Sequence, residues 1–579
     1  MSTRRSLRAI VALSAAWAFG SGCACDDTPT KRNSEGEAES EGEADPCLAE
    51  GSDGGVCGPE RLCCAATGDC FDDPHPAAGQ TCANPSSCSN AEDVEGCAPG
   101  YCLGFADPDA DAWDEDRCEV SPVPCACVEA PPLVAGLMGR HSSLAMAGGV
   151  AHVAAYEDEF GDLVIGVSED LDQIAWSIVD GVPDVSPTNG PSGWRGGISA
   201  RGDDVGNYTS IAIGSDGAVR ISYTDSDNGT LKLARASKAA DPDGGDGTGW
   251  AIHVVDAVPG AAVGWHSALL LGEGDVPVVG YEVHGIEDDG GVWHSQARVA
   301  TALSATPLSA KDWTVEVLED VVIACTGLCG SDEVCRVDGW LCAEELAEEE
   351  CGSACAGDEV CADVGGAPAC TAVVPDPTSD DVLDGVGLFM ALALHTDGRP
   401  ATAYYHHLPE SGEVHERHYD GAAWVGSIVD AGDTVDVGEG LSMTIDASDV
   451  LHLAYVDAYD AHALVYTQWS ESGGVLAREI ADDGVRGEGD VHPVGADSTI
   501  AIGDDGNVRV VYQDQQSSDL VLATRTDVDT WEVSALAEGA LGYGFYSDFG
   551  SDETGLYVST FYYDALSEPP GGVKLFVVP

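Results

Sequence analysis

Short segments in which hydrophobic and polar residues alternate recur along the chain from about residue 131 to its end. In residues 210–225 one such segment is followed by Asp216-Gly217 and then by a second alternating segment. Residues 498–514 repeat this arrangement around Asp505-Gly506. Alternation with a period of two places every other side chain on one face of a strand, and Asp-Gly favours a tight turn. Each copy therefore predicts a β-hairpin.

A tyrosine marks the second strand in each of seven repeats, and a third strand follows it. These tyrosines are Tyr156, Tyr223, Tyr281, Tyr404, Tyr455, Tyr512 and Tyr562. A tryptophan precedes a fourth strand at Trp176, Trp250, Trp313, Trp424 and Trp531, and in the fifth repeat we expect this strand near residues 476–480. The predicted fold is all-β, a seven-bladed β-propeller of four-stranded blades, because a closed ring covers the apolar faces and edges that one sheet leaves exposed. A sandwich of repeats or an open solenoid is the alternative.

The two ends of the repeat region suggest how the ring closes. The last repeat ends at Pro579 without a tryptophan strand, and the first begins at His141 after a spare segment over residues 131–137. We predict that residues 131–137 supply the missing fourth strand of the seventh blade.

Most of the 22 cysteines fall into two groups of even number. Twelve lie between Cys47 and Cys127, and eight interrupt the repeats. The eight are Cys325, Cys329, Cys335, Cys342, Cys351, Cys355, Cys361 and Cys370. Similar sequences at 330–335 and 356–361 divide the eight into two tandem units, for which we predict two disulfides each, with the pairing left open. Structural zinc is the competing interpretation, although the spacing lacks the close pairs that zinc favours.

The N-terminal residues have the features of an exported protein. Arg4, Arg5 and Arg8 precede an apolar stretch over residues 9–19 that is too short to span a bilayer. Repeated glutamates over residues 34–43 predict an extended acidic tether. The predicted organisation is a signal peptide (1–22), a disordered acidic tether (23–46), a cysteine-rich module (47–128) and the propeller (131–579) with a disulfide-rich double knot inserted at 322–372.

Residues 19–23 resemble a bacterial lipobox, in which small residues precede a cysteine that becomes the acylated N-terminus. The resemblance implies lipidation of Cys23, although the leucine usual three positions earlier is Gly20 here. The repeats are similar to the sialidase-like and lectin-like propellers of exported bacterial surface proteins. These resemblances imply an outer-membrane-anchored or extracellular lipoprotein of a Gram-negative bacterium.

The net charge of the chain limits the classes of partner that it can bind. The chain has 101 Asp and Glu against 24 Lys and Arg, a formal net charge of −77. Such a field repels nucleic acid and anionic lipid headgroups, so we predict no nucleic-acid partner and membrane attachment through the lipid anchor only. An extracellular glycan or protein is the predicted ligand.

Two groups of residues are candidates for binding a metal ion. His406 and His415 flank a predicted turn, and if they face each other across the hairpin their imidazoles would share a divalent cation. Asp107, Asp109 and Asp111 lie in an acidic loop whose oxygens suit Ca²⁺. Solvated or blade-packing histidines and a solvated loop are the competing interpretations, and no other cofactor is predicted.

The sequence identifies no catalytic residue. An aspartate lies two positions after the marker tyrosine in five repeats, at Asp158, Asp225, Asp457, Asp514 and Asp564. Five copies around a ring suit hydrogen bonds to strand-end turns better than catalysis. Sialidase chemistry would need clustered arginines, and the arginines here are scattered. The preferred function is therefore a surface binding or adhesion scaffold, with a sialidase-like glycoside hydrolase and a structural envelope component as alternatives.

Overall fold

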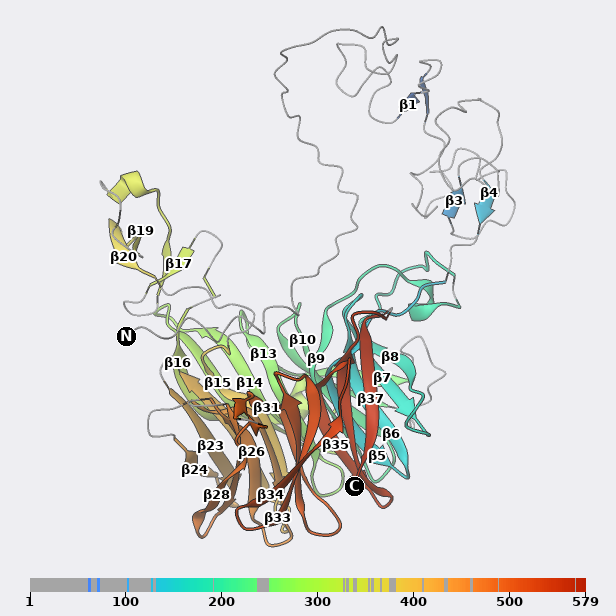
Figure 1. Cartoon of the computed structure of the whole chain (residues 1–579). Helices are drawn as coiled ribbons and strands as arrows, with labels where there is room; N and C mark the ends of the chain where they lie inside the picture. The colour runs from blue at the N-terminus through green and yellow to red at the C-terminus, as the bar shows by residue number, and fades with distance from the viewer. Residues whose placement is uncertain are drawn as a thin grey trace. The chain divides into compact units, whose positions relative to one another are not determined.

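The computed structural model describes residues 132–579 with short gaps, together with four three-residue strands nearer the N-terminus (Figure 1). The gaps are at 191, 237–248, 326–327, 330–332, 337–340, 352–354, 356–358, 365–366, 374–381, 409–410, 432–435, 459–461, 488 and 568. The signal peptide, Cys23, the acidic tether and the loop of Asp107, Asp109 and Asp111 lie outside the described residues.

The repeats form seven antiparallel sheets, six of four strands and a last one of three. Blade 1 holds β5 (Met138–Ala147), β6 (Val150–Glu157), β7 (Asp162–Ser168) and β8 (Ala175–Asp180); blade 2 holds β9 (Val205–Ile213), β10 (Val219–Asp225), β11 (Thr230–Ala236) and β12 (Trp250–Ala257); blade 3 holds β13 (Ala262–Leu271), β14 (Pro277–Glu287), β15 (Trp293–Ala302) and β16 (Trp313–Ile323). Blade 4 holds β21 (Gly385–Leu394), β22 (Pro400–Leu408), β23 (Ser411–Tyr419) and β24 (Trp424–Asp430); blade 5 holds β25 (Val437–Ile445), β26 (Leu451–Asp457), β27 (Ala463–Ser470) and β28 (Gly474–Asp482). Blade 6 holds β31 (Val494–Ile502), β32 (Val508–Asp514), β33 (Asp519–Asp527) and β34 (Thr530–Ala537); blade 7 holds β35 (Gly542–Asp552), β36 (Gly555–Tyr563) and β37 (Gly571–Val578). The predicted seven-bladed propeller is confirmed, as is the fourth strand expected near residues 476–480.

The remaining elements are short. They are the strands β1 (Arg61–Cys63), β2 (Cys70–Asp72), β3 (Tyr101–Leu103), β4 (Ala126–Val128), β17 (Glu333–Cys335), β18 (Cys342–Glu344), β19 (Glu359–Asp363), β20 (Pro368–Ala372), β29 (Val485–Arg486) and β30 (Asp490–Val491), and the 3-10 turns η5 (Trp194–Gly197), η6 (Ala310–Asp312) and η7 (Glu348–Cys351). Within the described part of the chain, no helix has the length and apolar character needed to cross a membrane.

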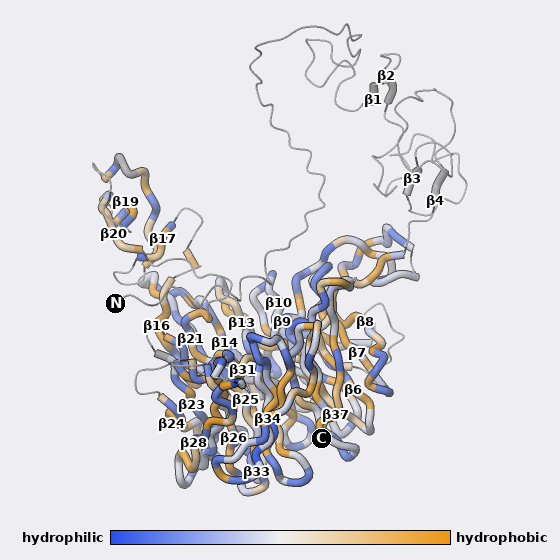
Figure 2. The backbone as a smooth tube through the Cα atoms, viewed as in Figure 1, coloured by the Kyte–Doolittle hydropathy of each residue, from blue (hydrophilic) through white to orange (hydrophobic). Residues whose placement is uncertain are grey.

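The Asp-Gly turns do what the sequence predicts. Gly217 and Gly506 adopt positive φ values of 74° and 78° between the first and second strands of blades 2 and 6. The carboxylate of Asp216 accepts a hydrogen bond from the backbone N–H of Ala218 at 2.9 Å, which closes the turn. Figure 2 shows hydrophobic segments recurring along the strands of the blades.

Each boundary between consecutive blades has its own hydrophobic cluster, seven in all. At the boundary of blades 1 and 2, for example, Leu163 and Ile165 pack against Ile221 and Tyr223. Burial of these faces against the next blade is the main stabilising contribution of a ring without a single central core.

The ring closes without a shared strand, so the prediction for residues 131–137 is wrong. Blade 7 keeps three strands, and blade 1 packs on it directly, with Leu144 and Val153 against Tyr557 and Leu575 (Figure 1). Two bonds tie the first strands together: the Leu144 N–H donates to Asp548 at 2.8 Å and the Ser142 hydroxyl to the Tyr546 carbonyl at 3.1 Å.

Residues 132–137 lie instead against the loops of blade 1. Pro132 forms a parallel bridge with Gly190, and the Trp194 N–H donates to the Leu133 carbonyl at 2.9 Å. The Leu137 N–H donates to Asp158 at 3.0 Å. The backbone groups that a closing strand would use are therefore already engaged.

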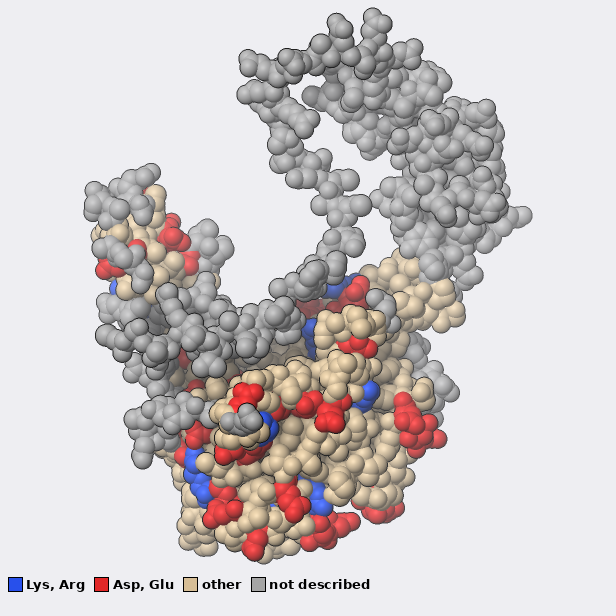
Figure 3. All heavy atoms as spheres, in the orientation of Figure 1, with Lys and Arg blue, Asp and Glu red and all other residues tan. Residues whose placement is uncertain are grey.

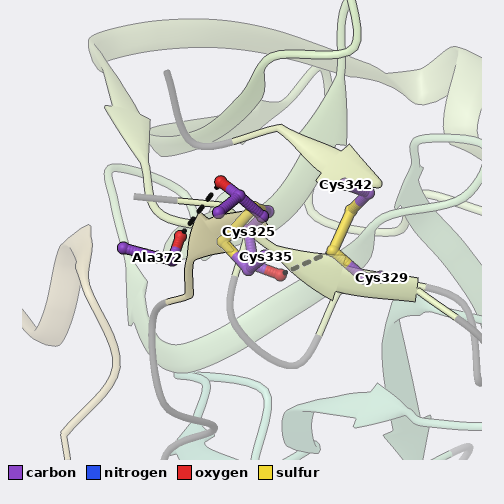
Figure 4. Close-up of a disulfide and its surroundings, with 6 residues drawn as sticks. Cys325, Cys329, Cys335, Cys342 and Ala372 are labelled. Carbon is purple, nitrogen blue, oxygen red and sulfur yellow. Dashed lines mark hydrogen bonds between the residues drawn. A yellow bond between two sulfur atoms is a disulfide. The ribbon is translucent and has the colours of Figure 1, made fainter. Parts of the chain in front are cut away.

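The cysteine insertion between blades 3 and 4 contains four disulfides. They are Cys325–Cys335, Cys329–Cys342, Cys351–Cys361 and Cys355–Cys370. Each unit pairs its first cysteine with its third and its second with its fourth, and Figure 4 shows the first unit. Because sulfurs in disulfides are not thiolates, zinc binding by these cysteines in this state is excluded. Disulfides are typical of an exported or extracellular protein.

Candidate functional site

Five blade boundaries share one polar contact, here called the tyrosine clasp. In each, a fully buried tyrosine of the second strand donates its hydroxyl proton to a carboxylate on the fourth strand of the preceding blade. The pairs are Tyr223–Asp180 at 2.7 Å, Tyr281–Asp256 at 2.7 Å, Tyr404–Glu319 at 2.8 Å, Tyr455–Asp430 at 2.8 Å and Tyr512–Asp482 at 2.6 Å.

Two of the marker tyrosines do not belong to this series. In blade 2, Asn207 of β9 pairs with Thr224, the residue after the clasp tyrosine. The equivalent residue of blade 1, Arg140, pairs with Tyr156. The residue before Tyr156, which is Ala155, therefore occupies the clasp position in blade 1. In blade 7 the same comparison gives Thr560 rather than Tyr562. The two boundaries concerned also lack the acid, because β34 ends at Ala537 and blade 7 has no fourth strand.

A basic residue completes the clasp at the first two of these boundaries. Lys232 and Arg298 lie directly across the hairpin from Tyr223 and Tyr281. The Lys232 ammonium lies 3.2 Å from Asp180, and the Arg298 guanidinium lies 2.8 Å from Asp256. A permanent cation beside each partly buried carboxylate compensates its desolvation.

At the boundary of blades 3 and 4 a histidine lies across from the clasp tyrosine, and the permanent cation comes from a position two residues further along the strand. His415 lies directly across from Tyr404, and its Nδ1 is 2.8 Å from Glu319 Oε2. The Arg417 guanidinium donates to the same oxygen at 2.7 Å. Glu413 lies 2.8 Å from the other ring nitrogen of His415, so this imidazole has a carboxylate at each end.

His406 joins the cluster from the second strand of the same blade. The condition considered from the sequence, that His406 lies directly opposite His415, is not met, because the register pairs His406 with Glu413 and His415 with Tyr404. The two imidazoles are diagonal neighbours instead, with ring centroids 4.7 Å apart. His406 Nδ1 lies 3.2 Å from Glu319 Oε1, but neither ring nitrogen has a partner in hydrogen-bond geometry.

Glu319 is held as an anion in this cluster. Burial alone would raise the pKa of its carboxyl group, but the neighbouring imidazoles of His406 and His415 and the hydroxyl group of Tyr404 hold that pKa well below its ordinary range. Ligand atoms of Glu319, His406 and His415 all lie within 4.8 Å of one another. Two imidazoles and a carboxylate are a donor set that suits Zn²⁺ or a similar ion.

A second group of residues surrounds the axis of the ring. Each first strand has a β-bulge, and the bulged residue has a positive φ of 47–64°. The seven bulged residues are His141, Tyr208, His266, Phe389, Gly440, Asp497 and Tyr546. A glycine stands two positions before each; at Gly206, for example, φ is 106° and an added Cβ would lie 2.9 Å from the Leu163 Cα. Non-glycine residues in this conformation are uncommon and are enriched at binding sites.

Five of the bulged side chains form a continuous arc, here called the aromatic arc. Ring centroids are 5.0 Å apart for Tyr546 and His141, 4.8 Å for His141 and Tyr208, 4.7 Å for Tyr208 and His266, and 4.8 Å for His266 and Phe389. All five side chains are half-buried. Burial lowers the pKa of His141 to about 3 and that of His266 to about 4, so both imidazoles are neutral at physiological pH.

Carboxyl groups lie where the arc is interrupted. Gly440 contributes no side chain, and Asp497 follows it around the ring. Burial raises the pKa of Asp497 to about 6, and burial together with Asp436 and Asp497 raises the pKa of Glu439 to about 7. This part of the axis therefore offers groups that both donate and accept hydrogen bonds near neutral pH.

Three of the five strand-end aspartates accept backbone hydrogen bonds in their own turns, as predicted. Asp225 accepts from Asn228 at 3.0 Å, Asp514 from Gln516 at 3.1 Å and Asp564 from Leu566 at 3.0 Å. Asp158 instead accepts from Leu137, and Asp457 pairs with Arg478 at 2.9 Å. None of the five contacts described here involves the histidine cluster.

Sequence reasoning missed Glu319 and the aromatic arc, yet both had a signal. A carboxylate recurs on the fourth strand, at Asp180, Asp256, Glu319, Asp430 and Asp482. The arc follows the recurrent pattern of a glycine, any residue and then the bulged residue, at 139–141, 206–208, 264–266, 387–389, 438–440, 495–497 and 544–546.

Comparisons with known proteins add distant structural likenesses. No family model matches the chain, and no curated protein matches it. A protein of unknown function from Dyadobacter fermentans is similar over 78% of this chain and 98% of its own, with 13% identity and a TM-score of 0.37. An ulvan lyase solved with bound -[GlcA(1-4)Rha3S]- is similar over 78% of this chain and 96% of its own, with 11% identity and a TM-score of 0.41. The lectin of Aleuria aurantia, solved with Fucalpha1-6GlcNAc, is similar over 69% of this chain and 97% of its own, with 11% identity and a TM-score of 0.33.

Proposed function

We propose that the chain is displayed at the surface of a Gram-negative bacterium, where its propeller binds an extracellular glycan at the axis of the ring. The observation that carries the proposal is the aromatic arc of Tyr546, His141, Tyr208, His266 and Phe389. Half-buried flat rings with a few polar groups beside them are the usual lining of sites for small organic ligands. Sugar rings present C–H faces that stack on such side chains and hydroxyl groups that bond to carboxyl groups.

The charge of the chain favours a neutral glycan over an anionic one. The net charge of −77 repels sulfated or carboxylated sugars. On the face that Figure 3 shows, acidic side chains are spread over the blades and basic ones are few. A protein with a basic surface is the second class of ligand that this field attracts.

Display at the surface rests on separate features of the chain. The disulfides at 325–370 support export, and the lipobox-like residues before Cys23 support acylation and an outer-membrane anchor. Substitution of Cys23→Ser is expected to move the chain from the membrane fraction to the medium. Retention of this variant in the membrane would contradict the anchor and leave glycan binding untouched.

Glycan binding is tested with the full chain on an array of neutral and anionic glycans, with and without Ca²⁺. We expect binding to neutral glycans that the Tyr208→Leu variant weakens about tenfold or more, because one stacking face is lost. Tyr419→Leu is the matched control, since Tyr419 is also half-buried but contacts Trp424 on the outer strands of blade 4.

Two results would overturn the proposal: no binding to any glycan, or binding that Tyr208→Leu leaves unchanged. Shortening of the bound glycan would favour the glycoside hydrolase instead. Binding only in the presence of Ca²⁺ would support the glycan site with a calcium requirement added.

A further inference from the structure

The boundary of blades 3 and 4 keeps the contact of Tyr404 with Glu319 but adds two histidines, His406 and His415, beside the carboxylate. We propose that Glu319, His406 and His415 bind a zinc ion. The inference is independent of glycan binding, because the aromatic arc and this cluster share no residue.

His415 gives the first argument. Its Nδ1 is 2.8 Å from Glu319 and its Nε2 is 2.8 Å from Glu413. A neutral imidazole has one N–H and donates to only one of two carboxylates. A cation between His415 Nδ1 and Glu319 satisfies both sides, because Nε2–H then donates to Glu413. This carboxylate–histidine–metal arrangement is the usual way in which a protein orients a ligating histidine.

His406 gives the second argument. Blades 2, 5 and 6 place Asp225, Asp457 and Asp514 two positions after the clasp tyrosine, whereas blade 4 places His406 there. The side chain is 11% exposed, and neither ring nitrogen has a hydrogen-bond partner. A buried polar ring without a partner costs about 1–3 kcal/mol, so its retention beside a carboxylate needs a compensating contact. Coordination of a metal ion through one nitrogen supplies it.

The distances give the third argument. Zinc lies about 2.0–2.2 Å from nitrogen and oxygen ligands, so neighbouring ligand atoms lie roughly 3–3.5 Å apart. His406 Nδ1 is 3.2 Å from Glu319 Oε1, and His415 Nδ1 is 2.8 Å from Glu319 Oε2. Small rotations of these side chains bring all three within reach of one ion, and a fourth position is left for water or another ligand.

The neighbours of the three ligands favour this use. Tyr404 and Arg417 both donate to Glu319 Oε2, at 2.8 and 2.7 Å, and hold the carboxylate in place. Oε1 faces His406 and remains for the ion. Imidazole ligands favour zinc over Ca²⁺ and Mg²⁺, so the site is distinct in chemistry from the exposed carboxylates of this acidic chain.

Zinc titration of the chelator-treated full chain, in excess Mg²⁺ to occupy exposed carboxylates, tests the proposal. We expect one tight zinc equivalent, and one Co²⁺ equivalent with the visible absorption of a low-symmetry nitrogen-ligated ion. His406→Gln is expected to weaken zinc binding at least 100-fold and to remove the Co²⁺ band. Glu413→Gln is expected to weaken zinc binding 10–100-fold, as is usual for a residue that orients a ligand.

His407→Gln is the matched control. His407 is the next residue, and its Nδ1 contacts the Leu383 carbonyl at 3.2 Å. This variant is expected to bind zinc like the unchanged chain. Less than one equivalent of zinc in the unchanged chain, or equal affinity in His406→Gln, would overturn the proposal.

Discussion

Tyr281 at the boundary of blades 2 and 3 and Tyr404 at the next boundary occupy the same place in the repeat, yet their surroundings differ. Twelve buried hydrophobic residues form the cluster around Tyr281, and four form the cluster around Tyr404. The carboxylate of Asp256 meets a permanent cation, Arg298, whereas Glu319 meets two imidazoles as well as Arg417. The boundary of blades 3 and 4 therefore has fewer buried apolar residues and more titratable side chains than the boundary of blades 2 and 3.

In a repeat protein, equivalent positions of different blades can be compared with one another. Where two blades use the same position for the same contact, packing and compensation of charge explain the residue. Where one blade departs from the others toward metal-binding side chains, as blade 4 does with His406 and His415, the departure indicates chemistry that the ring does not need for stability.

The largest expected effect comes from breaking the purely structural clasp. Asp256→Ala removes the carboxylate that accepts hydrogen bonds from the Tyr281 hydroxyl at 2.7 Å and from the Arg298 guanidinium at 2.8 Å. We expect the free energy of unfolding to fall by about 3 kcal/mol, measured by urea denaturation. The loss should be the same with and without zinc. A loss below about 1 kcal/mol would show that the clasp is not a stabilising contact.

Substitution of Glu439, a half-buried acid that no cation contacts among the described residues, should instead stabilise the chain. The pKa of Glu439 is raised to about 7, so the folded state holds this proton over a pH range in which the unfolded chain has released it. Stability therefore falls as pH rises from about 4.5 to 7 and levels off above that. Glu439→Gln should remove this penalty and stabilise the chain by about 2 kcal/mol at pH 8, with no effect near pH 4.

Urea denaturation of the Glu439→Gln variant at several pH values checks this sign. Asp256→Asn is the contrasting variant, since it weakens the contacts of this carboxylate with Tyr281 and Arg298 and should destabilise the chain at pH 8. A Glu439→Gln variant that is less stable than the unchanged chain at pH 8 would contradict the interpretation that ionisation of this half-buried acid destabilises the fold.

The smallest effect concerns the hydroxyl groups that join first strands. The Ser267 hydroxyl donates to the Tyr208 carbonyl at 2.8 Å, whereas blade 4 has Met390 at the equivalent position. Ser267→Ala should cost about 1 kcal/mol in the free energy of unfolding. Ser215→Ala, which removes an exposed hydroxyl bonded to Asp275 at 2.7 Å, should cost less than about 0.5 kcal/mol. Equal losses in the two variants would show that the bond of Ser267 with the Tyr208 carbonyl stabilises the chain no more than an exposed hydrogen bond does.

The sequence predicted the blades well because each hairpin carries its own signal. Alternation, Asp-Gly turns and a recurrent tyrosine depend on neighbouring residues, so the ring of seven units could be inferred. The closing strand was predicted wrongly, because the hydrogen bonds of residues 132–137 with Gly190, Trp194 and Asp158 join segments that the sequence does not link. Tyr156 and Tyr562 were assigned to the series because a shift of one or two residues in register is invisible in spacing.

The candidate site was only partly predictable for a similar reason. His406 and His415 were found as a local pair, but their register was off by two residues. Glu319 lies in another blade, with the cysteine insertion between it and the histidines. The aromatic arc depends on a backbone bulge rather than on a side-chain pattern, and its members differ from blade to blade. Contacts made across blades therefore needed the structure.

A crystal of the full chain grown with zinc, with anomalous diffraction measured at the zinc absorption edge, tests the specialisation of the blade 3–4 boundary most directly. The account predicts an anomalous peak about 2.0–2.2 Å from His406, His415 and Glu319, and none at the clasp of Tyr281, Asp256 and Arg298. Density at the surface carboxylates alone, with the two imidazoles in contact with protein only, would contradict it.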